Sequence, residues 1–599
     1  MDGKDFAHLM EDMDGYLCEL AGSQIRDGLH ILGDVPQGDT MIDMLQALTR
    51  LPNLHVPSLR ESIASMFNLE ATKLLSNQGA RLDTVPTSLV ELAGRPIVTS
   101  GDAVETIDEL GKHALALLNE KEFNIKDVKN VIQETFSPLS ASVDISDLII
   151  TLDFVCETLV PNLGATTQEI TYLIAALDGG FIPPGPSGSP TRGMAHLLPT
   201  GRNFYSVNPQ ALPSNAAWQV GVGLANELLS RYLKETNTYP EHVAISIWGT
   251  AAMRTHGDDI AQVFALLGIR PIWQQESHRV IGVELIPLSE LGRPRIDVTC
   301  RISGFFRDAF PHLITLLDDA TNMAIDANEP LEKNFIRKHY LEDIASNMNE
   351  SSARYRVFGC PPGAYGIGIL DLIEAQNWKD DADFAKCYIN WGGYAYSKKE
   401  PQGVDARSQF THRLTSVEVA IHNQDDREHD IYDSDDYFQF HGGMIATIRA
   451  LSGKQPKGYF GDSSNPDTPK VRDIKEETLR VYRTRVVNPK WLESIQRHGY
   501  KGASEMAATV DYMFGYDATA NVMSDFMYQQ IAQSYALDES TQKFYEECNP
   551  WALRGISERL LEAAERDLWE NPDPATIEAL RQTLVKTDSM LEGRLDPTV

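Results

Sequence analysis

Cysteine, long apolar runs and basic charge are all scarce in this sequence. The chain holds 6 cysteines among 599 residues, and no two of them form a Cys-x-x-Cys pair. Neither a disulfide framework nor a zinc ribbon is therefore expected, and a reduced cytoplasmic location fits best. No apolar run reaches the roughly 18 residues that suggest a transmembrane helix, and the first residues lack the pattern of a signal peptide.

The scarcity of basic residues leaves the chain strongly acidic. Lys and Arg number 53 against 85 Asp and Glu, which gives a formal net charge of −32. Because an acidic surface repels phosphate groups, we expect neither nucleic acid nor an anionic membrane as the main partner. The Gly-x-x-x-x-Gly-Lys-Ser/Thr pattern of a phosphate-binding loop is also absent, so no ATP site of this type is expected in the chain.

What is present indicates a folded protein with several regions. Hydrophobic residues make up 42% of the chain and charged residues 23%, which is ordinary for a soluble globular protein. Apolar spacing predicts a mainly helical region over 1–180, an α/β region with site loops over 181–330, and a mainly helical region over 331–599. The expected fold class is α/β with large helical portions, in which helical regions flank a mixed or parallel sheet core.

Strands and helices alternate most clearly after residue 213. A helix capped by Ser214 or Asn215 is predicted over 216–235, and a second helix over 258–267. Strands are predicted over 242–248, 270–273, 283–286 and 295–300. In such sheets ligands bind at the carboxyl ends of the strands. Residues 248–259 (WGTAAMRTHGDD) lie at one such end, so we expect part of a site there.

Residues 180–214 are rich in Gly and Pro, a composition typical of a linker. Arg202, Phe204 and Tyr205 are unusual in linkers, however, and long ordered loops in compact proteins are often functional. Both interpretations stay open.

An acidic cluster over 425–441 is the most informative local feature. It holds seven carboxylates and two imidazoles in seventeen residues, interleaved with aromatic rings. Carboxylate and imidazole together suit divalent first-row metals, and crowded acids favour proton transfer. On a helix, His429 and Asp433 would share a face and could bind one ion or exchange a proton. The alternative is a solvated acidic turn; an EF-hand is excluded because the required Gly and Glu are missing.

His256 and Asp258 lie at the expected strand end, just before the helix predicted over 258–267. Asp258 and Asp259 can simply cap this helix. His256 stands where a ligand or a base is expected. Another glycine-rich stretch, 363–368, has the wrong spacing for a dinucleotide loop and either approaches a ligand closely or starts a helix.

Taken together, several strings of this chain resemble the large subunit of aerobic cobaltochelatase (CobN) and, more distantly, the H subunit of magnesium chelatase. The strings are 24–30 (QIRDGLH), 199–207 (PTGRNFYSV), 248–259, 291–298 (LGRPRIDV), 301–312 (RISGFFRDAFPH), 362–366 (PGAYG), 391–396 (WGGYAY), 427–430 (REHD) with 433–437 (DSDDY), and 497–502 (RHGYKG). They are collinear and extend across the whole chain, which makes the resemblance specific.

The resemblance implies insertion of Co²⁺, as a substrate, into hydrogenobyrinic acid a,c-diamide on the route to cobalamin. It also implies separate AAA+ partner subunits that hydrolyse ATP with Mg²⁺, in agreement with the missing phosphate-binding loop, and no tightly bound cofactor. Histidine and carboxylate would hold the ion transiently and accept the ring N–H protons. An aromatic cavity would hold the macrocycle, with arginines near its acid groups.

These expectations assign the candidate site residues by role. For catalysis the candidates are His256, Asp258, His429 and Asp433; for substrate binding Arg202, Arg254, Tyr365 and Trp391; and for metal binding His429, Asp430, Asp435 and His441.

The sequence also departs from the family pattern. Asn208 and Gln210 stand where the family usually has Asp and Arg, and Cys360-Pro361 replaces a more common Ser-Lys. A His-Gly-x-Leu-Glu-Trp-type segment that normally precedes this part is not found, so a separate N-terminal half is a possible partner. Three alternatives stay open: insertion of Mg²⁺ or Ni²⁺, a tetrapyrrole-binding scaffold that is inactive without that half, and a metallohydrolase.

Overall fold

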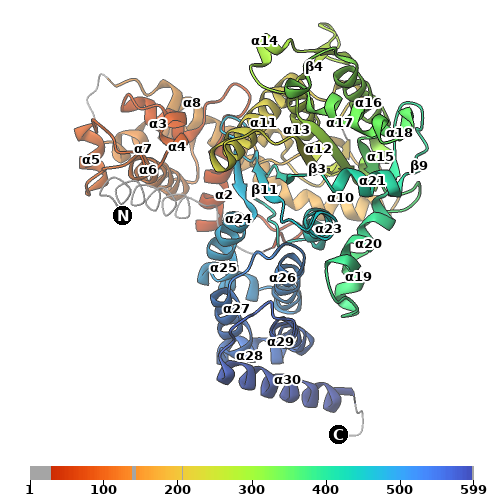
Figure 1. Cartoon of the computed structure of the whole chain (residues 1–599). Helices are drawn as coiled ribbons and strands as arrows, with labels where there is room; N and C mark the ends of the chain where they lie inside the picture. Colours follow the sequence, from red (N-terminus) through yellow and green to blue (C-terminus); the bar gives the residue numbers. More distant parts are fainter. Residues whose placement is uncertain (1–28, 138–142, 206, 596–599) are drawn as a thin grey trace. The chain divides into compact units, whose positions relative to one another are not determined.

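The computed structural model describes residues 29–137, 143–205 and 207–595 of the chain. The chain divides into two compact units, Met1–Ser206 and Val207–Val599 (Figure 1).

The described part of the first unit is built mainly of short helices. These are α2 (Asp39–Thr49), α3 (Leu59–Met66), α4 (Ala71–Ser76), α5 (Thr87–Ala93), α6 (Ser100–Glu120), α7 (Val128–Thr135), α8 (Ser146–Phe154), α9 (Val160–Gly164) and α10 (Gln168–Leu177). Helix α3 begins at a capping box, in which Ser58 and Glu61 each accept a hydrogen bond from the other's backbone N–H. The apolar faces of the helices meet in a core that includes Leu45, Ile63 and Leu115, all fully buried.

One helical stretch of this unit, Ser146–Leu177, is long and apolar enough to cross a membrane by length and composition alone. The sequence analysis did not predict it. Its most apolar window is 39% buried, and Leu148, Leu152 and Leu159 lie fully buried in the core of the unit. A single such helix is weak evidence, since core helices of soluble proteins meet the same criterion.

The Gly- and Pro-rich stretch after α10 is ordered. Strand β1 (Pro184–Pro186) pairs in parallel with β2 (Asn203–Tyr205). The boundary between the two units falls just after β2, between 206 and 207. The composition typical of a linker therefore covers a folded loop that leads to the unit boundary.

A mixed sheet of eight strands, in the order β12-β11-β10-β3-β6-β7-β8-β9, forms the centre of the second unit. Its strands are β3 (His242–Ile247), β6 (Asp297–Ile302), β7 (Val357–Gly359), β8 (Tyr394–Ala395), β9 (Val404–Asp405), β10 (Val419–Gln424), β11 (Lys457–Asp462) and β12 (Lys470–Asp473). The pairings from β11 through β10, β3 and β6 to β7 are parallel, and the others are antiparallel. The expected α/β class with large helical portions is confirmed.

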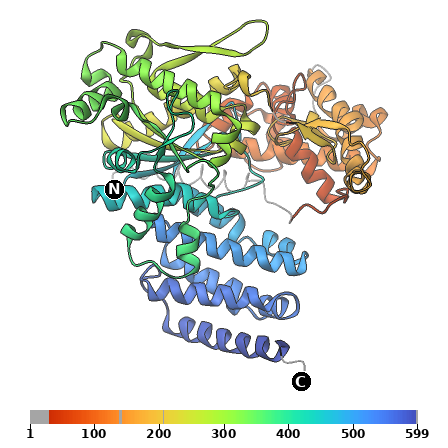
Figure 2. The same ribbon diagram turned by 90° about the vertical axis from the view of Figure 1, so that its right-hand side faces the viewer.

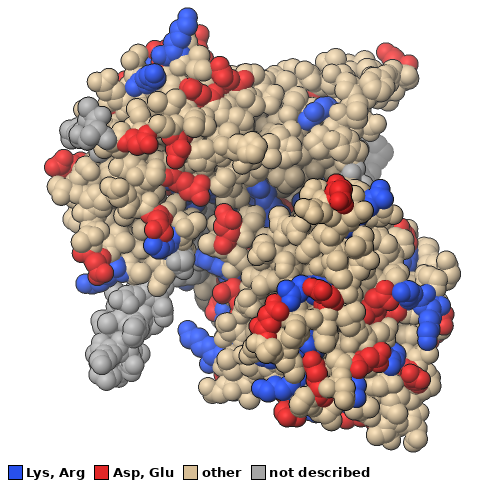
Figure 3. Space-filling view, turned by 90° about the horizontal axis from the view of Figure 1, so that it is seen from above, with Lys and Arg blue, Asp and Glu red and all other residues tan. Residues whose placement is uncertain are grey.

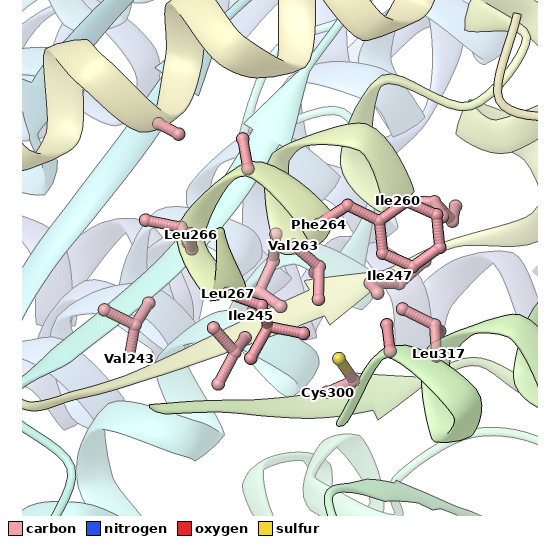
Figure 4. Packing of buried hydrophobic residues seen from close by; sticks show 14 of the residues in the cluster. Val243, Ile245, Ile247, Ile260, Val263, Phe264, Leu266, Leu267, Cys300 and Leu317 are labelled. Atoms are coloured by element: carbon pink, nitrogen blue, oxygen red, sulfur yellow. The ribbon is translucent and has the colours of Figure 1, made fainter. Parts of the chain in front are cut away.

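Helices cover the central strands closely enough to bury them completely. Helices α11 (Asn215–Thr236), α13 (Asp258–Leu267) and α16 (Pro311–Asp326) pack with this part of the sheet. In Figure 4, Phe264 and Val263 from α13 lie with Ile245 from β3 and Leu317 from α16. Every residue of β3 is buried, as expected for a strand covered on both faces.

The local predictions for this region succeed where caps mark the ends. The helix predicted over 258–267 is α13, which ends at Gly268 with φ 69°, a conformation that favours glycine. Helix α11 begins after Ser214, whose hydroxyl accepts from the N–H of Ala217, as predicted. The strands predicted over 270–273 and 283–286 exist as β4 (Ile269–Trp273) and β5 (Val280–Leu285), but they form a separate antiparallel hairpin outside the main sheet.

The region beyond 330, predicted to be mainly helical, also supplies strands β7 to β12. Strands β7, β8 and β9 are only two or three residues long, and β10 ends in His422, Asn423 and Gln424. Strand β11 contains Gly458 and Gly461. Because none of these strands shows a clear apolar alternation, their sequence carries little strand signal.

The remaining helices of the second unit surround the sheet or follow it in sequence. Around the sheet are α12 (Gly249–Thr255), α14 (Leu288–Leu291), α15 (Gly304–Ala309), α17 (Phe335–Ala345), α18 (Glu350–Arg354), α19 (Ile369–Glu374), α20 (Asp381–Gly392), α21 (Arg407–Leu414), α22 (Asp435–Tyr437), the π-helix η7 (Phe438–Gly442) and α23 (Gly443–Ser452). The last helices are α24 (Ile474–Val481), α25 (Pro489–Gln496), α26 (Gly499–Ala520), α27 (Asp525–Ile531), α28 (Glu539–Cys548), α29 (Pro550–Glu565) and α30 (Pro574–Leu595). Figure 2 shows α30 as the outermost of these, and it packs against α29.

Acidic side chains are spread over the surface and mixed with basic ones. On the face seen in Figure 3, acidic and basic side chains lie interspersed, and the described residues of that face form no extended basic patch. This agrees with the expectation from the net charge of −32.

The core of the second unit yields a stability prediction. Phe264 is fully buried, so Phe264→Ala is expected to lower the free energy of unfolding of this unit by about 3–5 kcal/mol through lost burial and a cavity. Urea unfolding followed by circular dichroism measures the change. The half-exposed Phe526 in the same unit is the control: Phe526→Ala should cost less than about 1 kcal/mol. Equal losses for the two variants would contradict this account of the core.

Candidate active site at the carboxyl edge of the sheet

The parallel strands send their carboxyl ends to one edge of the sheet, and chemically active side chains gather there. Strand β3 ends at Trp248 and helix α12, which carries Arg254. Strand β10, its neighbour in the sheet, is followed directly by Asp425 and Asp426. Edges of this kind bind ligands in open α/β sheets.

The guanidinium group of Arg254 pairs with both of these carboxylates. Its Nε and Nη2 donate to Oδ2 and Oδ1 of Asp425 at 2.8 and 2.7 Å, and Nε lies 3.6 Å from Oδ2 of Asp426. The two aspartates are 4 and 5% exposed. Burial would raise the pKa of Asp426, but the hydrogen bond with His429 and the charge of Arg254 lower it overall.

Asp259 adds to the same group a carboxyl side chain whose pKa is raised rather than lowered. Its Oδ1 accepts a hydrogen bond from Nδ2 of Asn423 at 2.8 Å. Burial raises the pKa of Asp259 to about 7, and the nearby carboxylates of Asp258 and Asp425 contribute to the rise. A carboxyl group with this pKa can give or take a proton at neutral pH.

His422 is the central residue that the sequence analysis missed. It lies within aromatic surroundings, with ring centroids 4.5 Å from Trp248, 5.3 Å from Tyr437 and 6.2 Å from Phe460. The residue is 2% exposed, and its ring makes no side-chain hydrogen bond among the described residues; the backbone of Ser246 is the one polar group that supports its charged form. Burial lowers the pKa of His422 well below its usual value, so the imidazole is neutral and keeps a lone pair available to a metal ion.

The predicted residues 429–433 form turns rather than the helix considered from sequence. The side chain of His429 is 66% exposed, and its Nδ1 lies 3.7 Å from Oδ1 of Asp426. Asp430 instead accepts two hydrogen bonds from Arg485 at 2.6 and 2.8 Å, and Asp433 lies 4.0 Å from the same guanidinium. The structure thus brings His429 to the Arg254 group and turns the other two carboxylates toward Arg485.

Two further predicted metal ligands, Asp435 and His441, have partners within the fold. Asp435 accepts from Nε2 of Gln439 at 2.6 Å. The ring nitrogens of His441 lie 3.2 Å from the Tyr516 hydroxyl and 3.1 Å from the Ala420 carbonyl. Burial lowers the pKa of His441 to about 4. Their roles as ligands stay predictions.

His256 ends helix α12 in the left-handed conformation, with φ 57°. Its carbonyl oxygen accepts from the N–H of Ser214. Asp258 opens α13 beside Asp259, so both predicted catalytic residues lie next to the Arg254 group, one as a turn residue and one as a helix start.

Arg202, a predicted substrate ligand, belongs to the first unit. Its Nε donates to the carbonyl of Pro199 at 3.0 Å and its Nη2 to that of Leu197 at 2.7 Å.

Tyr365 and Trp391 lie near the carboxyl ends of β6 and β7. The Tyr365 hydroxyl donates to Asp308 at 2.6 Å, and the Arg307 guanidinium lies 5.3 Å from the Tyr365 ring. Tyr365 is 57% and Trp391 36% exposed. A side chain at Gly368 would overlap the Trp391 indole. Two exposed aromatic faces are therefore available on the same sheet edge for a flat ligand.

A cluster with metal-ligand chemistry also occurs at the opposite, amino edge of the sheet. His242, Asp297 and His339 bring their ligand atoms within 4.8 Å of one another. Both ring nitrogens of His242 are engaged, however, with the hydroxyls of Ser416 and Thr299 at 2.8 Å each. Burial lowers its pKa to about 3.

The carboxylate of this second cluster is engaged as well. Asp297 accepts from Nε and Nη2 of Arg356 at 2.6 and 3.0 Å and bonds Nδ1 of His339 at 2.9 Å. These contacts lower the pKa of Asp297 well below its usual range, despite complete burial, which acts in the opposite direction. Such a saturated network stabilises the fold and leaves no ligand atom for a metal.

The comparisons with known proteins agree with the resemblance seen in the sequence. The family model described as CobN/Magnesium Chelatase matches residues 1–576. The chain is 43% identical to CobN, the aerobic cobaltochelatase subunit of Pseudomonas aeruginosa, over 97% of this chain and 46% of that protein. It is 35% identical to the H subunit of magnesium chelatase from Chlorobaculum parvum over 73% of this chain and 34% of that protein.

A solved structure is also similar. The catalytic subunit of cobaltochelatase from Mycobacterium tuberculosis superposes with a TM-score of 0.89 at 45% identity, covering 98% of this chain and 47% of that one. The chain thus spans less than half the length of the relatives it matches.

The raised pKa of Asp259 predicts a pH dependence of stability. Because the folded state holds this proton more tightly than the unfolded state, stability falls as the pH rises from about 4 through 7. Asp259→Asn keeps the acceptor for Asn423 without the charge, so it should flatten this decline and stabilise the fold at pH 8 by on the order of a few kcal/mol.

Thermal unfolding between pH 4 and 8 measures the effect. Asp467→Asn, at an exposed position, is the control and should keep the slope of the original chain. An Asp259→Asn variant with that same slope would exclude the raised pKa.

Proposed function

Because the chain belongs to the CobN/magnesium chelatase family, we propose that it carries the tetrapyrrole- and metal-handling site of a cobaltochelatase. The proposed reaction inserts Co²⁺ into hydrogenobyrinic acid a,c-diamide on the route to cobalamin. The observation that carries this proposal is the neutral, aromatic-enclosed imidazole of His422, next to the Arg254 group of carboxylates.

The donor atoms favour cobalt over magnesium. Mg²⁺ prefers oxygen ligands in octahedral geometry, whereas imidazole suits Co²⁺ and other first-row metals. The similarity to proteins named cobaltochelatase, at 43 and 45% identity over nearly the whole chain, also exceeds that to the H subunit of magnesium chelatase. Ni²⁺ shares the preference for imidazole, so it is included as a competing metal in the insertion assay.

Insertion requires the metal ion to lose water and the ring nitrogens to lose protons. His429, which is mostly exposed, and Asp426 behind it can replace water ligands of an arriving ion. His422 can then offer its neutral ring to the metal ion, and Asp259 can exchange protons near pH 7. The charge of Arg254 acts on Asp259, Asp426 and His422 alike, which keeps these groups electrostatically coupled.

Exposed aromatic faces at the carboxyl ends of β6 and β7 complete the proposed site. Tyr365 and Trp391 offer flat apolar contact to a macrocycle. ATP hydrolysis is assigned to separate cytoplasmic AAA+ subunits with Mg²⁺. The part of the relatives that this chain does not span is supplied as a second polypeptide in the assay.

Absorption spectroscopy tests the proposal. Titration of the chain with hydrogenobyrinic acid a,c-diamide should shift the spectrum of the ring through binding alone. Adding Co²⁺, ATP, the AAA+ subunits and the second polypeptide should then produce the spectrum of the cobalt product, faster than with Mg²⁺ or Ni²⁺. No spectral change in either stage would refute the function, and binding without any insertion would favour a scaffold.

His422→Gln tests the residue on which the site is centred. It should slow insertion at least tenfold while ring binding changes little, because the imidazole acts on the metal ion rather than on the ring periphery. His412→Gln is the matched control, since His412 of helix α21 is half-exposed and bonds Asp343 of α17, and it should leave the rate unchanged. Equal rates for the two variants would remove His422 from the mechanism.

A further inference from the structure

Among the described residues, burial and ion pairing go together for the arginines, with one exception. Arginines under 10% exposed are Arg295, Arg301, Arg307, Arg356, Arg413, Arg472, Arg480 and Arg485. Seven of them pair with a carboxylate: Arg295 with Glu329, Arg307 with Asp308, Arg356 with Asp297, Arg413 with Asp343, Arg472 with Asp462, Arg480 with Glu477 and Arg485 with Asp430. Arg301, which is 0% exposed, has no carboxylate partner among the described residues.

The contacts of Arg301 do not supply a negative charge. Its Nη1 donates to the carbonyl of Ile302, and its Nη2 lies 3.8 Å from the sulfur of Cys360. The guanidinium lies 5.2 Å from the ring centroid of Phe440 and 5.7 Å from that of Tyr388. The Ile302 carbonyl, the Cys360 thiol and the two aromatic rings offset only part of the free-energy cost of burying a full charge.

Neither neighbouring acidic side chain is a carboxylate. Burial raises the pKa of Tyr388 far above its usual value, and its hydroxyl donates to the carbonyl of Phe440 at 3.0 Å. The thiol of Cys360 donates to the carbonyl of Gly366 at 3.3 Å. The guanidinium of Arg301 therefore has no carboxylate counter-charge among the described residues.

The edge of the guanidinium that normally receives a carboxylate receives none from the described residues in Arg301. Arg254, Arg356 and Arg485 each hold their aspartate through Nε and Nη2 together. In Arg301, Nε has no hydrogen-bond partner among the described residues, Nη2 lies 3.8 Å from the Cys360 sulfur, and the guanidinium also interacts with the neutral Tyr388 hydroxyl. Beside Nε lies Gly392 of α20, where an added Cβ would come within 2.7 Å of that nitrogen.

Arg301 is also placed next to the proposed active site. In the sheet it pairs with Ser246 of β3, which in turn pairs with His422 of β10, so the three side chains share one face of the sheet. The hydroxyl of Ser246 has no hydrogen-bond partner among the described residues. Phe440 lies between Arg301 and the aromatic surroundings of His422, because its ring contacts both Arg301 and Trp248, and Trp248 packs on His422.

We propose that the Nε and Nη2 edge of Arg301 binds a carboxylate group, supplied by a peripheral acid group of the tetrapyrrole substrate. An incoming carboxylate oxygen replaces the sulfur of Cys360 at Nη2, while the backbone of Gly392 packs close to Nε. The identity of the ligand rests on the proposed function, whereas the need for a buried anion rests on Arg301 alone. The carboxylate would anchor the ring at the sheet face that holds His422.

The first test is the stability of the full chain without ligand. Arg301→Met removes an uncompensated buried charge, so its melting temperature should equal or exceed that of the original chain. Arg356→Met is the matched control, because it leaves Asp297 buried and without its arginine, and it should lower the melting temperature clearly. A loss for Arg301→Met as large as that for Arg356→Met would mean that Arg301 has a structural partner and would overturn the proposal.

The second test is binding of hydrogenobyrinic acid a,c-diamide, followed by absorption. Affinity should fall at least tenfold for Arg301→Met, recover partly for Arg301→Lys, and fall for Gly392→Ala, whose methyl group would displace the guanidinium. The methyl ester of the ring should bind at least tenfold more weakly than the free acid to the original chain. With Arg301→Met, ester and acid should bind equally. An undiminished preference for the acid in that variant would overturn the proposal and leave the proposed function intact.

Acetate separates a failure of the function from a failure of the anion site. If the ring does not bind to the original chain at all, the proposed function fails. In that case a melting temperature raised by acetate more than by chloride, in the original chain and not in Arg301→Met, would still support a carboxylate site. No difference between the two salts would reject that site as well.

Discussion

The ion pair between Arg254 and Asp425 is the interaction on which the candidate site depends. It joins the ends of two neighbouring parallel strands that are far apart in the sequence, and it holds a second buried carboxylate, Asp426, in its field. Without this guanidinium, Asp259, Asp425 and Asp426 would be buried close together without the positive charge that now lies beside them. With it, Asp426 stays ionised while Asp259, one step further away, holds its proton up to about pH 7. One cation thus gives similar side chains different protonation states.

Hydrogen-bond partners, rather than residue types, distinguish a structural histidine from a candidate functional one at the two edges of the sheet. His242 at the amino edge and His422 at the carboxyl edge are both buried and neutral. The first has both ring nitrogens engaged by hydroxyls, and the second makes no side-chain hydrogen bond among the described residues. A buried polar atom without a partner costs stability, so it is retained where a ligand supplies the missing bond. The same reasoning separates Arg301 from the seven buried arginines that have carboxylate partners.

The aromatic side chains around His422 exclude water from this part of the molecule and leave flat surfaces nearby. Trp248 and Tyr437 lie directly against the imidazole. The low polarity of these surroundings strengthens each electrostatic contact made there. A metal ion in transit therefore needs no permanent site, since a neutral imidazole and nearby carboxylates can replace its water ligands one after another.

The sequence by itself determined the α/β class, the acidic surface, the boundaries of helix α13 and the family. These follow from signals that lie within a few residues, such as the acidic first turn at Asp258 and the C-cap at Gly268, or from long collinear strings. It also pointed to the acidic cluster but not to its division, in which Asp425 and Asp426 face Arg254 while Asp430 and Asp433 face Arg485. It did not reveal His422, because strand β10 ends in polar residues and lacks an apolar alternation. Only the tertiary structure decided these pairings, since the order of strands in a sheet places side by side residues that are distant in the chain.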